Sequence, residues 1–424
     1  MATILASKLR HIATDKDLRT RILFIFFMLL IFRLGANIPI PGVDVARLAS
    51  FLAGNQLFGL LNIFSGGGLS NLSLFMLGVS PYITASIIMQ LLSMIFPRVR
   101  EMMHEEGTAG RKKLTQYSRF LTVPLAVIQA FGLLTLLKNS GALGELTFFD
   151  QMYNVTLVVA GSLFLMWIGE LMTERGIGNG VSLIIFAGIV ASLPQAIAQL
   201  FVTFDVTQIP LYLGFVVIAV LVVAGVVIIT EAERPIPITY AKRVRGMRVY
   251  GGVSTYLPLR VNQAGVIPII FALSILLFPQ MIVNYFSTST NEIIQSVASF
   301  MATLIQNTWF YGTFYFVLVF LFTYFYTAVT FDPNAIATNL QKSGAFVPGV
   351  RPGDPTASHI AGILTRITLV GALFLGVIAV LPFVMQAVTG NQSLAIGGTG
   401  LLIVVSVVLD LIKRVDAQLG MREY

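Results

Sequence analysis

The chain has 424 residues, of which 56% are hydrophobic and only 11% are charged. Soluble globular proteins carry about 25% charged residues, so this composition excludes an ordinary soluble domain and indicates a membrane protein. There is no cysteine, and the three histidines, His11, His104 and His359, lie far apart in sequence. The cysteine and histidine content excludes disulfides and offers no ligand pattern for a metal. We therefore expect that the protein binds no metal or cofactor and is not an enzyme.

Apolar runs of about the length that a helix needs to cross a bilayer recur along the whole chain. They predict ten spanning helices, near residues 22–38, 72–95, 117–137, 153–172, 181–201, 210–230, 262–283, 308–331, 366–387 and 397–412. The basic stretch before the first run resembles a signal peptide. It lacks a clear small-residue cleavage site, so we expect an uncleaved first helix.

Basic residues are distributed unevenly among the predicted loops. Most of the 27 lysines and arginines lie before the first span, after the tenth, and in every second loop between them. Only Arg47 and Lys138 lie in the opposite loops, and Arg33 lies within the first span. The positive-inside rule therefore predicts a multi-pass membrane protein with both termini cytoplasmic.

Ten spans divide into two groups of five at the short connection 202–209. This division predicts an N-terminal half, residues 1–203, and a C-terminal half, residues 204–424. Because five is an odd number, the second half is inverted relative to the first. Inverted halves commonly enclose a transport path between them.

Residues 57–95 combine a short apolar piece, a glycine break and a full-length apolar run. The short piece ends at Phe64, and Gly66, Gly67 and Gly68 follow after Ser65. Irregular backbone at membrane depth requires burial by protein or a water-filled cavity around it. A discontinuous helix of this kind indicates a transport path.

Two loops on the predicted cytoplasmic side are long. Residues 231–261 alternate in places between apolar and polar and contain the pair Gly251-Gly252, which predicts a β-hairpin. Residues 332–365 are rich in proline and glycine, which predicts a structured loop with few helical turns.

Ionisable residues within the predicted spans are few: Arg33, Glu170 and Asp410. All three lie near helix ends, from which their side chains can reach the interface. A proton-coupled transporter normally has more carboxylates at mid-membrane, so this scarcity argues against one. The run GTAGRKK (107–113) lacks P-loop spacing, and ERGIGNG (174–180) predicts a tight turn between the fourth and fifth spans.

Four motifs, in this order, resemble those of the SecY family of bacterial protein-conducting channels. They are FSGGGLSNLSLFMLGVSPYITASIIMQLL (64–92), ERGIGNGVSLIIFAGIVASLP (174–194), LRVNQAGVIPIIFA (259–272) and KSGAFVPGVRPG (342–353). The resemblance implies an all-α integral membrane protein with ten transmembrane helices in two inverted halves around a central pore. It also implies translocation of unfolded secretory polypeptides and lateral release of transmembrane segments into lipid, driven by a partner ATPase or ribosome.

The resemblance further implies an apolar ring at the waist of the pore and a short plug at about residues 57–67. The ring residues are Val79, Ile83, Val181, Ile185, Ile270 and Ile403. The plug residues are Leu57, Phe58, Leu60, Leu61, Ile63 and Phe64. From the residues alone, Val79 and Ile83 are ordinary apolar positions on one helical face. A hydrophobic constriction stops ions by dewetting, and it makes no fixed hydrogen bonds.

Polar positions Thr84, Gln129 and Asn262 border the lateral gate of the resembled family. Taken alone, they are ordinary helix-to-helix contacts worth about 0.6 kcal/mol each. Arg243 and Arg351, in the two long loops, match arginines that dock partners. The implied partners are the subunits SecE and SecG, the SecA ATPase, the ribosome through rRNA and ribosomal proteins, signal peptides, unfolded preproteins and membrane lipids.

Two other functions stay open on the residues alone. A secondary transporter for a small solute would also have inverted repeats and a broken helix, although scarce buried charge and long basic loops disfavour it. A selective ion channel would need a carbonyl filter or a charged ring, and the sequence offers neither.

Overall fold

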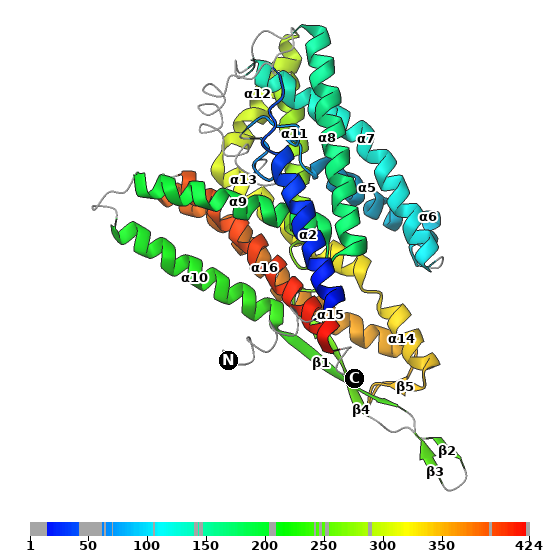
Figure 1. Cartoon of the computed structure of the whole chain (residues 1–424). Coiled ribbons are helices and arrows are strands. Elements are labelled where there is room, and N and C mark those ends of the chain that lie inside the picture. The colour runs from blue at the N-terminus through cyan, green and yellow to red at the C-terminus, as the bar shows by residue number, and fades with distance from the viewer. Residues whose placement is uncertain are drawn as a thin grey trace.

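The structure is a computed structural model, and its elements carry the labels of Figure 1. It describes residues 15–41, 62, 65–69, 71–104, 107–139, 143, 147–202, 209–240, 243–245, 248–250, 254–286, 291–389 and 392–420. These residues form an elongated helical bundle whose short strands gather at one end (Figure 1).

Within the described residues, the first half of the chain forms helices and no strands. The helices are α2 (Lys16–Gly35), α5 (Ser80–Ile95), α6 (Pro97–His104), α7 (Gly107–Asn139), α8 (Phe148–Arg175) and α9 (Gly180–Val202). The predicted tight turn between the fourth and fifth spans is confirmed, since residues 176–179 separate α8 from α9.

The second half contributes helices and all the described strands. Its helices are α10 (Ile209–Glu231), α11 (Ile267–Phe286), α12 (Glu292–Gln306), α13 (Thr308–Thr330), α14 (Pro333–Lys342), α15 (Asp354–Thr389) and α16 (Gln392–Gly420). Its strands are β1 (Glu233–Tyr240), β2 (Arg243–Arg245), β3 (Arg248–Tyr250), β4 (Ser254–Arg260) and β5 (Ala345–Phe346).

Each of the ten predicted spans overlaps one helix: α2, α5, α7, α8, α9, α10, α11, α13, α15 or α16. Within the described residues, five segments are long and apolar enough to cross a membrane by themselves. They are Lys112–Lys138, Phe148–Arg175, Tyr212–Glu231, Thr308–Lys342 and Asp354–Met385. Among the remaining apolar helices, α5 has 16 residues and covers only about 24 Å at 1.5 Å per residue.

Polar side chains cap the N-termini of several helices by accepting hydrogen bonds from the first backbone N–H groups. The Asp15 carboxylate accepts from the backbone of Asp17 at 3.0 Å at the start of α2. Asn307 does the same for Trp309 at 3.0 Å at the start of α13. The residue types at these ends are therefore those that the helices require.

The second span starts later than the sequence predicted. Residues 71–79 form turns, and α5 begins at Ser80, so the predicted start at Leu72 is wrong. Leu72 has φ of 40° and Gly78 has φ of 58°, left-handed conformations that interrupt a right-handed helix. Pro81 lies in the first turn of α5, where its missing N–H is not needed.

This irregular stretch is buried by protein, as backbone at membrane depth must be. The Ile40 amide donates to the Leu72 carbonyl at 2.9 Å, and the Leu74 amide donates to the Ile38 carbonyl at 2.9 Å. From α8, the Ser162 hydroxyl donates to the Gly78 carbonyl at 3.0 Å. The break in the helix therefore has hydrogen-bond partners in neighbouring segments.

The predicted β-hairpin in residues 231–261 is confirmed. β1 pairs antiparallel with β4, from Glu233 opposite Arg260 to Thr239 opposite Ser254. Between them, β2 pairs with β3 as a smaller ribbon.

The prediction of few helical turns in residues 332–365 is wrong. This segment contains all of α14 and the first turns of α15. The prolines that suggested a loop are positioned where helices accept them: Pro333 opens α14 after the Asp332 cap, and Pro355 follows the first residue of α15.

The largest buried cluster joins side chains from both halves of the chain. Ile83 of α5 and Ile185 of α9 belong to it, together with Ile270 of α11 and Ile403 of α16. A second cluster packs the irregular stretch against α7 and α8, and a third lies under β1 and β4. The two halves therefore share one continuous core.

Helix α9 passes unusually close to the glycine break. A Cβ atom added at Gly188 would lie 2.2 Å from the Gly66 Cα atom, far inside van der Waals contact. Gly66 itself has φ of 66°, which favours glycine. Both residues are therefore required for this crossing.

We expect Gly188→Ala to lower the thermal denaturation midpoint in detergent, because a backbone atom must move to admit the methyl group. The cost should be about 1–3 kcal/mol. Gly214→Ala on α10 is the matched control, since nothing lies within 4 Å of an added Cβ there. This control should be neutral or stabilising by up to about 1 kcal/mol. Equal behaviour of the two variants would contradict the close crossing.

Candidate functional site

A cavity of about 410 Å³ lies where helices of the two halves meet. α5, α7, α8 and α9 border it from the first half, and α11 and α13 border it from the second. Along α5 its lining changes from Ile83 through Ser86 to Gln90, so its apolar part lies nearer the start of that helix. The remaining polar lining includes Thr115, Thr173, Asn179 and Ser182.

The six predicted ring residues, here called the ring, all belong to or pack against the largest buried cluster. Val79, Ile83, Ile185, Ile270 and Ile403 are buried members of one cluster, and Val181 packs against it. Ile83, Val181, Ile185 and Ile270 also line the cavity. The ring thus contributes four apolar residues, from α5, α9 and α11, to the cavity wall, and Val79 and Ile403 are not among the lining residues.

An ion pair forms part of the cavity wall. Arg119 of α7 approaches Glu170 of α8 through two atoms, with Nε to Oε1 at 2.9 Å and Nη2 to Oε2 at 2.8 Å. From α5, the Tyr82 hydroxyl donates to the same Glu170 Oε1 at 3.2 Å. Three helices of the first half are therefore tied together beside the ring.

The sequence alone did not identify this ion pair. Glu170 was expected to reach the interface from a helix end, whereas it is mostly buried and paired with Arg119. The partners are 51 and 88 positions away in sequence, so no local pattern relates them. Asp410 is different, because it pairs with Arg414 one turn along α16 at 2.8 Å.

The three predicted gate residues are all buried. The Thr84 hydroxyl donates to the Ser80 carbonyl in its own helix at 3.0 Å. The Asn262 side chain donates to the Gly265 carbonyl at 3.2 Å, in the turn before α11. These two bonds are local, so they do not latch one helix to another, although α11 does contact both α5 and α7.

The predicted plug residues Leu57, Phe58, Leu60, Leu61, Ile63 and Phe64 lie outside the described residues. The adjoining glycine break is described. Arg33 of α2 donates to the Gly66 carbonyl at 3.5 Å, and the Gly67 amide donates to the Asn62 carbonyl at 2.8 Å. The segment that follows the predicted plug is therefore held against α2 and α9.

The two long loops meet each other at one end of the bundle (Figure 1). β5 from the second loop adds to the edge of β1, with Thr239 opposite Phe346. Arg243 begins β2, and Arg351 is exposed in the turns before α15. The two predicted docking arginines thus lie in different parts of this end, Arg243 in the separate β2–β3 ribbon and Arg351 in the turns between β5 and α15.

No group of three or more histidine, aspartate or glutamate side chains that could hold a metal occurs within the described part of the chain. The cavity has one ion pair in its wall and an apolar group at one side. Its chemistry suits passage or packing of a polymer rather than catalysis.

Comparison with known proteins identifies the family. The SecY family model matches residues 73–412. The protein translocase subunit SecY of Streptomyces coelicolor is 44% identical over 429 residues, which cover 96% of each chain.

Solved structures of low sequence identity share the fold. One described as a protein conducting channel has a TM-score of 0.61 at 18% identity, covering 92% of this chain and 90% of that chain. Sec61 from a canine ribosome-channel complex of the endoplasmic reticulum has a TM-score of 0.56 at 17% identity, with the same coverage.

Identity at this level over nearly the whole length settles the family, and the apolar helices fit its membrane location. The chain belongs to the SecY family and is a multi-pass membrane subunit of a protein-conducting translocase channel, not an enzyme.

Proposed function

We propose that unfolded polypeptides pass between the two halves of this chain through the ring, which closes around them and blocks ions. The observation that supports this path is that four ring residues, from α5, α9 and α11, line a cavity between the two halves whose wall also holds polar groups. An apolar constriction has no hydrogen-bonding groups that select a particular sequence. It can therefore surround many different chains and still exclude ions by dewetting.

We propose that the ten helices that overlap the predicted spans all cross the membrane, in inverted halves 1–203 and 204–424. The contacts between the halves support this division. α11 contacts α5 and α7 on one side, and α16 contacts α9 on the other. A path bounded by two such contact regions can open at one while the other serves as a hinge.

The gate is proposed at the first of these regions, where α11 meets α5 and α7, with Thr84, Gln129 and Asn262 beside it. The local hydrogen bonds of Thr84 and Asn262 support an easily separated seam, since opening it would break neither bond. An apolar segment in the path could then leave sideways into lipid, where its burial is favourable.

The plug, at about residues 57–67, is proposed to close the path from the side of the glycine break. Gly66 approaches α9 at Gly188, within the helix that carries Val181 and Ile185. A segment attached at Gly66 therefore lies within reach of the ring. Its glycines would allow it to swing away when a polypeptide enters.

We propose that the strand-bearing end and both termini face the cytoplasm, in the inner membrane. The basic loops on that end support this orientation through the positive-inside rule. Arg243 and Arg351 would contact the SecA ATPase or the ribosome there, and the similar canine Sec61 structure is a ribosome-channel complex. SecE and SecG remain the proposed companion subunits.

A trapped precursor tests the path directly. We expect a cysteine at Ile185 or Ile270 to form a disulfide with a cysteine in the middle of an arrested precursor, in vesicles supplied with SecA and ATP. The chain has no native cysteine, so each product is unambiguous. A cysteine at Leu213, 62% exposed on α10, is the control and should give no product. Equal yields at all three positions would refute the path.

Locking the seam tests the gate. Gln90 of α5 and Ile267 of α11 line the same cavity from opposite halves. We expect a bifunctional maleimide across a cysteine pair at these positions to lower precursor transport by roughly fivefold or more, because the halves must separate.

The matched control pair is Gln90 and Thr173, which line the same cavity from within the first half. Locking this pair should leave most transport intact, since the reagent then occupies similar space without joining the halves. Equal loss in both pairs would mean that the reagent blocks the cavity, and the gate proposal would fail.

A further inference from the structure

Helix α12 has three faces of different character. One face packs against the bundle: Ala298 is buried, and Ile305 packs against the largest core cluster. A second face is apolar but open, with Ile293 75%, Val297 60% and Phe300 64% exposed. These three follow a spacing of four and three, so they share one side of the helix.

The third face of α12 is polar and almost uncharged. Ser296, Ser299 and Thr303 are exposed, and each hydroxyl donates to a backbone carbonyl of its own helix at 2.8–2.9 Å. Glu292 is the one ionisable residue in the sequence of α12. The polar residues therefore lie next to the open apolar face, on a helix whose remaining side contacts protein.

Helix α12 is too short to cross the membrane, and it lies at one end of the bundle. Its 15 residues cover about 22 Å, less than the hydrocarbon core of about 30 Å. It contacts α11 and α13 and lies at the end of the bundle opposite the strands (Figure 1). It is therefore situated where the membrane-crossing helices α11 and α13 leave the bilayer.

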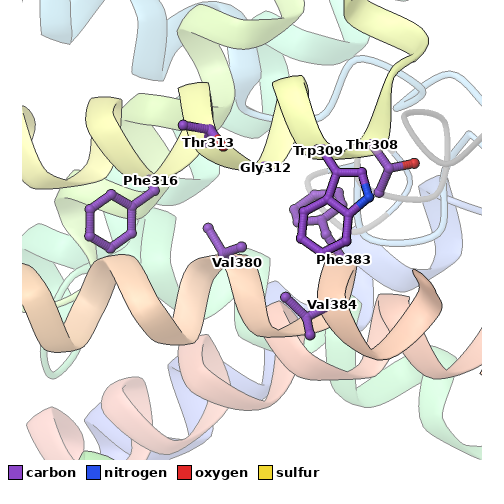
Figure 2. A pocket seen from close by; sticks show the side chains of 8 residues that line it. All are labelled: Thr308, Trp309, Gly312, Thr313, Phe316, Val380, Phe383 and Val384. Carbon is purple, nitrogen blue, oxygen red and sulfur yellow. The ribbon is translucent and has the colours of Figure 1, made fainter. Parts of the chain in front are cut away.

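The neighbouring helix α13 begins with exposed aromatic residues. α13 begins one residue after α12 ends at Gln306, with Trp309 70% exposed and Phe310 beside it. Trp309 also borders an apolar cavity of about 250 Å³ between α13 and α15, as Figure 2 shows with Phe316, Val380 and Phe383. Aromatic residues in such positions mark the membrane interface.

We propose that α12 is an interfacial membrane anchor, which buries Ile293, Val297 and Phe300 among the lipids of the leaflet opposite the strands and holds the adjoining end of α11 at that surface. A helix with one strongly apolar side and one polar side lies in the plane of the interface. Under the proposed orientation this is the outer leaflet. Because the helix carries almost no charge, its insertion depends on apolar burial rather than on anionic headgroups.

The same surface would serve a water-soluble partner only if it lay clear of the lipids. The exposed Trp309 and Phe310 at the adjoining start of α13 favour the bilayer. An experiment can distinguish lipid contact from partner contact. A quencher attached to lipid reaches a residue that is inserted among lipids, but it does not reach a residue that a protein covers.

Single-cysteine variants Phe300→Cys and Ser299→Cys provide adjacent positions on the apolar and polar faces. Each is labelled with an environment-sensitive fluorophore in the full chain, reconstituted in vesicles of phosphatidylethanolamine and phosphatidylglycerol. We expect nitroxide lipids labelled at a shallow depth to quench the label at position 300 at least about twofold more than the label at 299. Aqueous iodide should show the reverse order.

Replacing phosphatidylglycerol by phosphatidylcholine should leave both results unchanged, because the proposed insertion is apolar. Equal iodide access at the two positions, or no nitroxide quenching at 300, would overturn the proposal, including the case of a protein-covered face. The readout requires no transport, so it remains informative even if the proposed path through the ring is wrong.

Discussion

The backbone of a chain in a membrane must satisfy its own hydrogen bonds, and this constraint governs the arrangement of the whole molecule. Helices meet it internally, but the turns at 71–79 cannot. They are paired instead with residues 38–40 and with Ser162 of α8. The two glycines Gly66 and Gly188 let α9 approach this break closely. The irregular segment is thereby held against α8 and α9.

The path combines a cavity that has polar walls with an apolar group that has no hydrogen-bonding side chains. Polar residues such as Ser86 and Gln90 keep the cavity compatible with water and with a peptide backbone. Ile83 and Ile270, which line the same cavity, belong to the apolar core that joins the halves. The paired Arg119 and Glu170 fix three helices of the first half, so movement is expected at the contacts of α11 rather than within that half.

The positions of most long helices could be predicted from the sequence, because full-length apolar runs are strong signals. The charge bias between loops likewise predicted their orientation. The ring was not readable in this way. Its members are ordinary apolar residues in four distant segments, so only the family resemblance singled them out. The pairing of Glu170 with Arg119 and Tyr82 likewise depends on long-range packing with no local signature.

The remaining errors have local physical causes. Pro333 and Pro355 suggested a loop because proline interrupts helices, yet both residues lie in first turns, where proline fits. The apolar pattern of α12 was overlooked because it is too short to span. The spacing of its apolar residues, from Ile293 through Val297 to Phe300, is nevertheless visible in the sequence. Such spacing is expected for an amphipathic helix that lies at the membrane interface.

The most direct measurement of the central claim is the resting ion conductance of planar bilayers containing ring variants. Ile83→Gly and Ile403→Gly each remove four carbons from the proposed constriction, so both should raise conductance by roughly tenfold as water enters. Val220→Gly, on the exposed side of α10, carries the same helix penalty without touching the ring and should remain tight. Unchanged conductance in both ring variants, or an equal leak in the control, would contradict a seal formed by these residues.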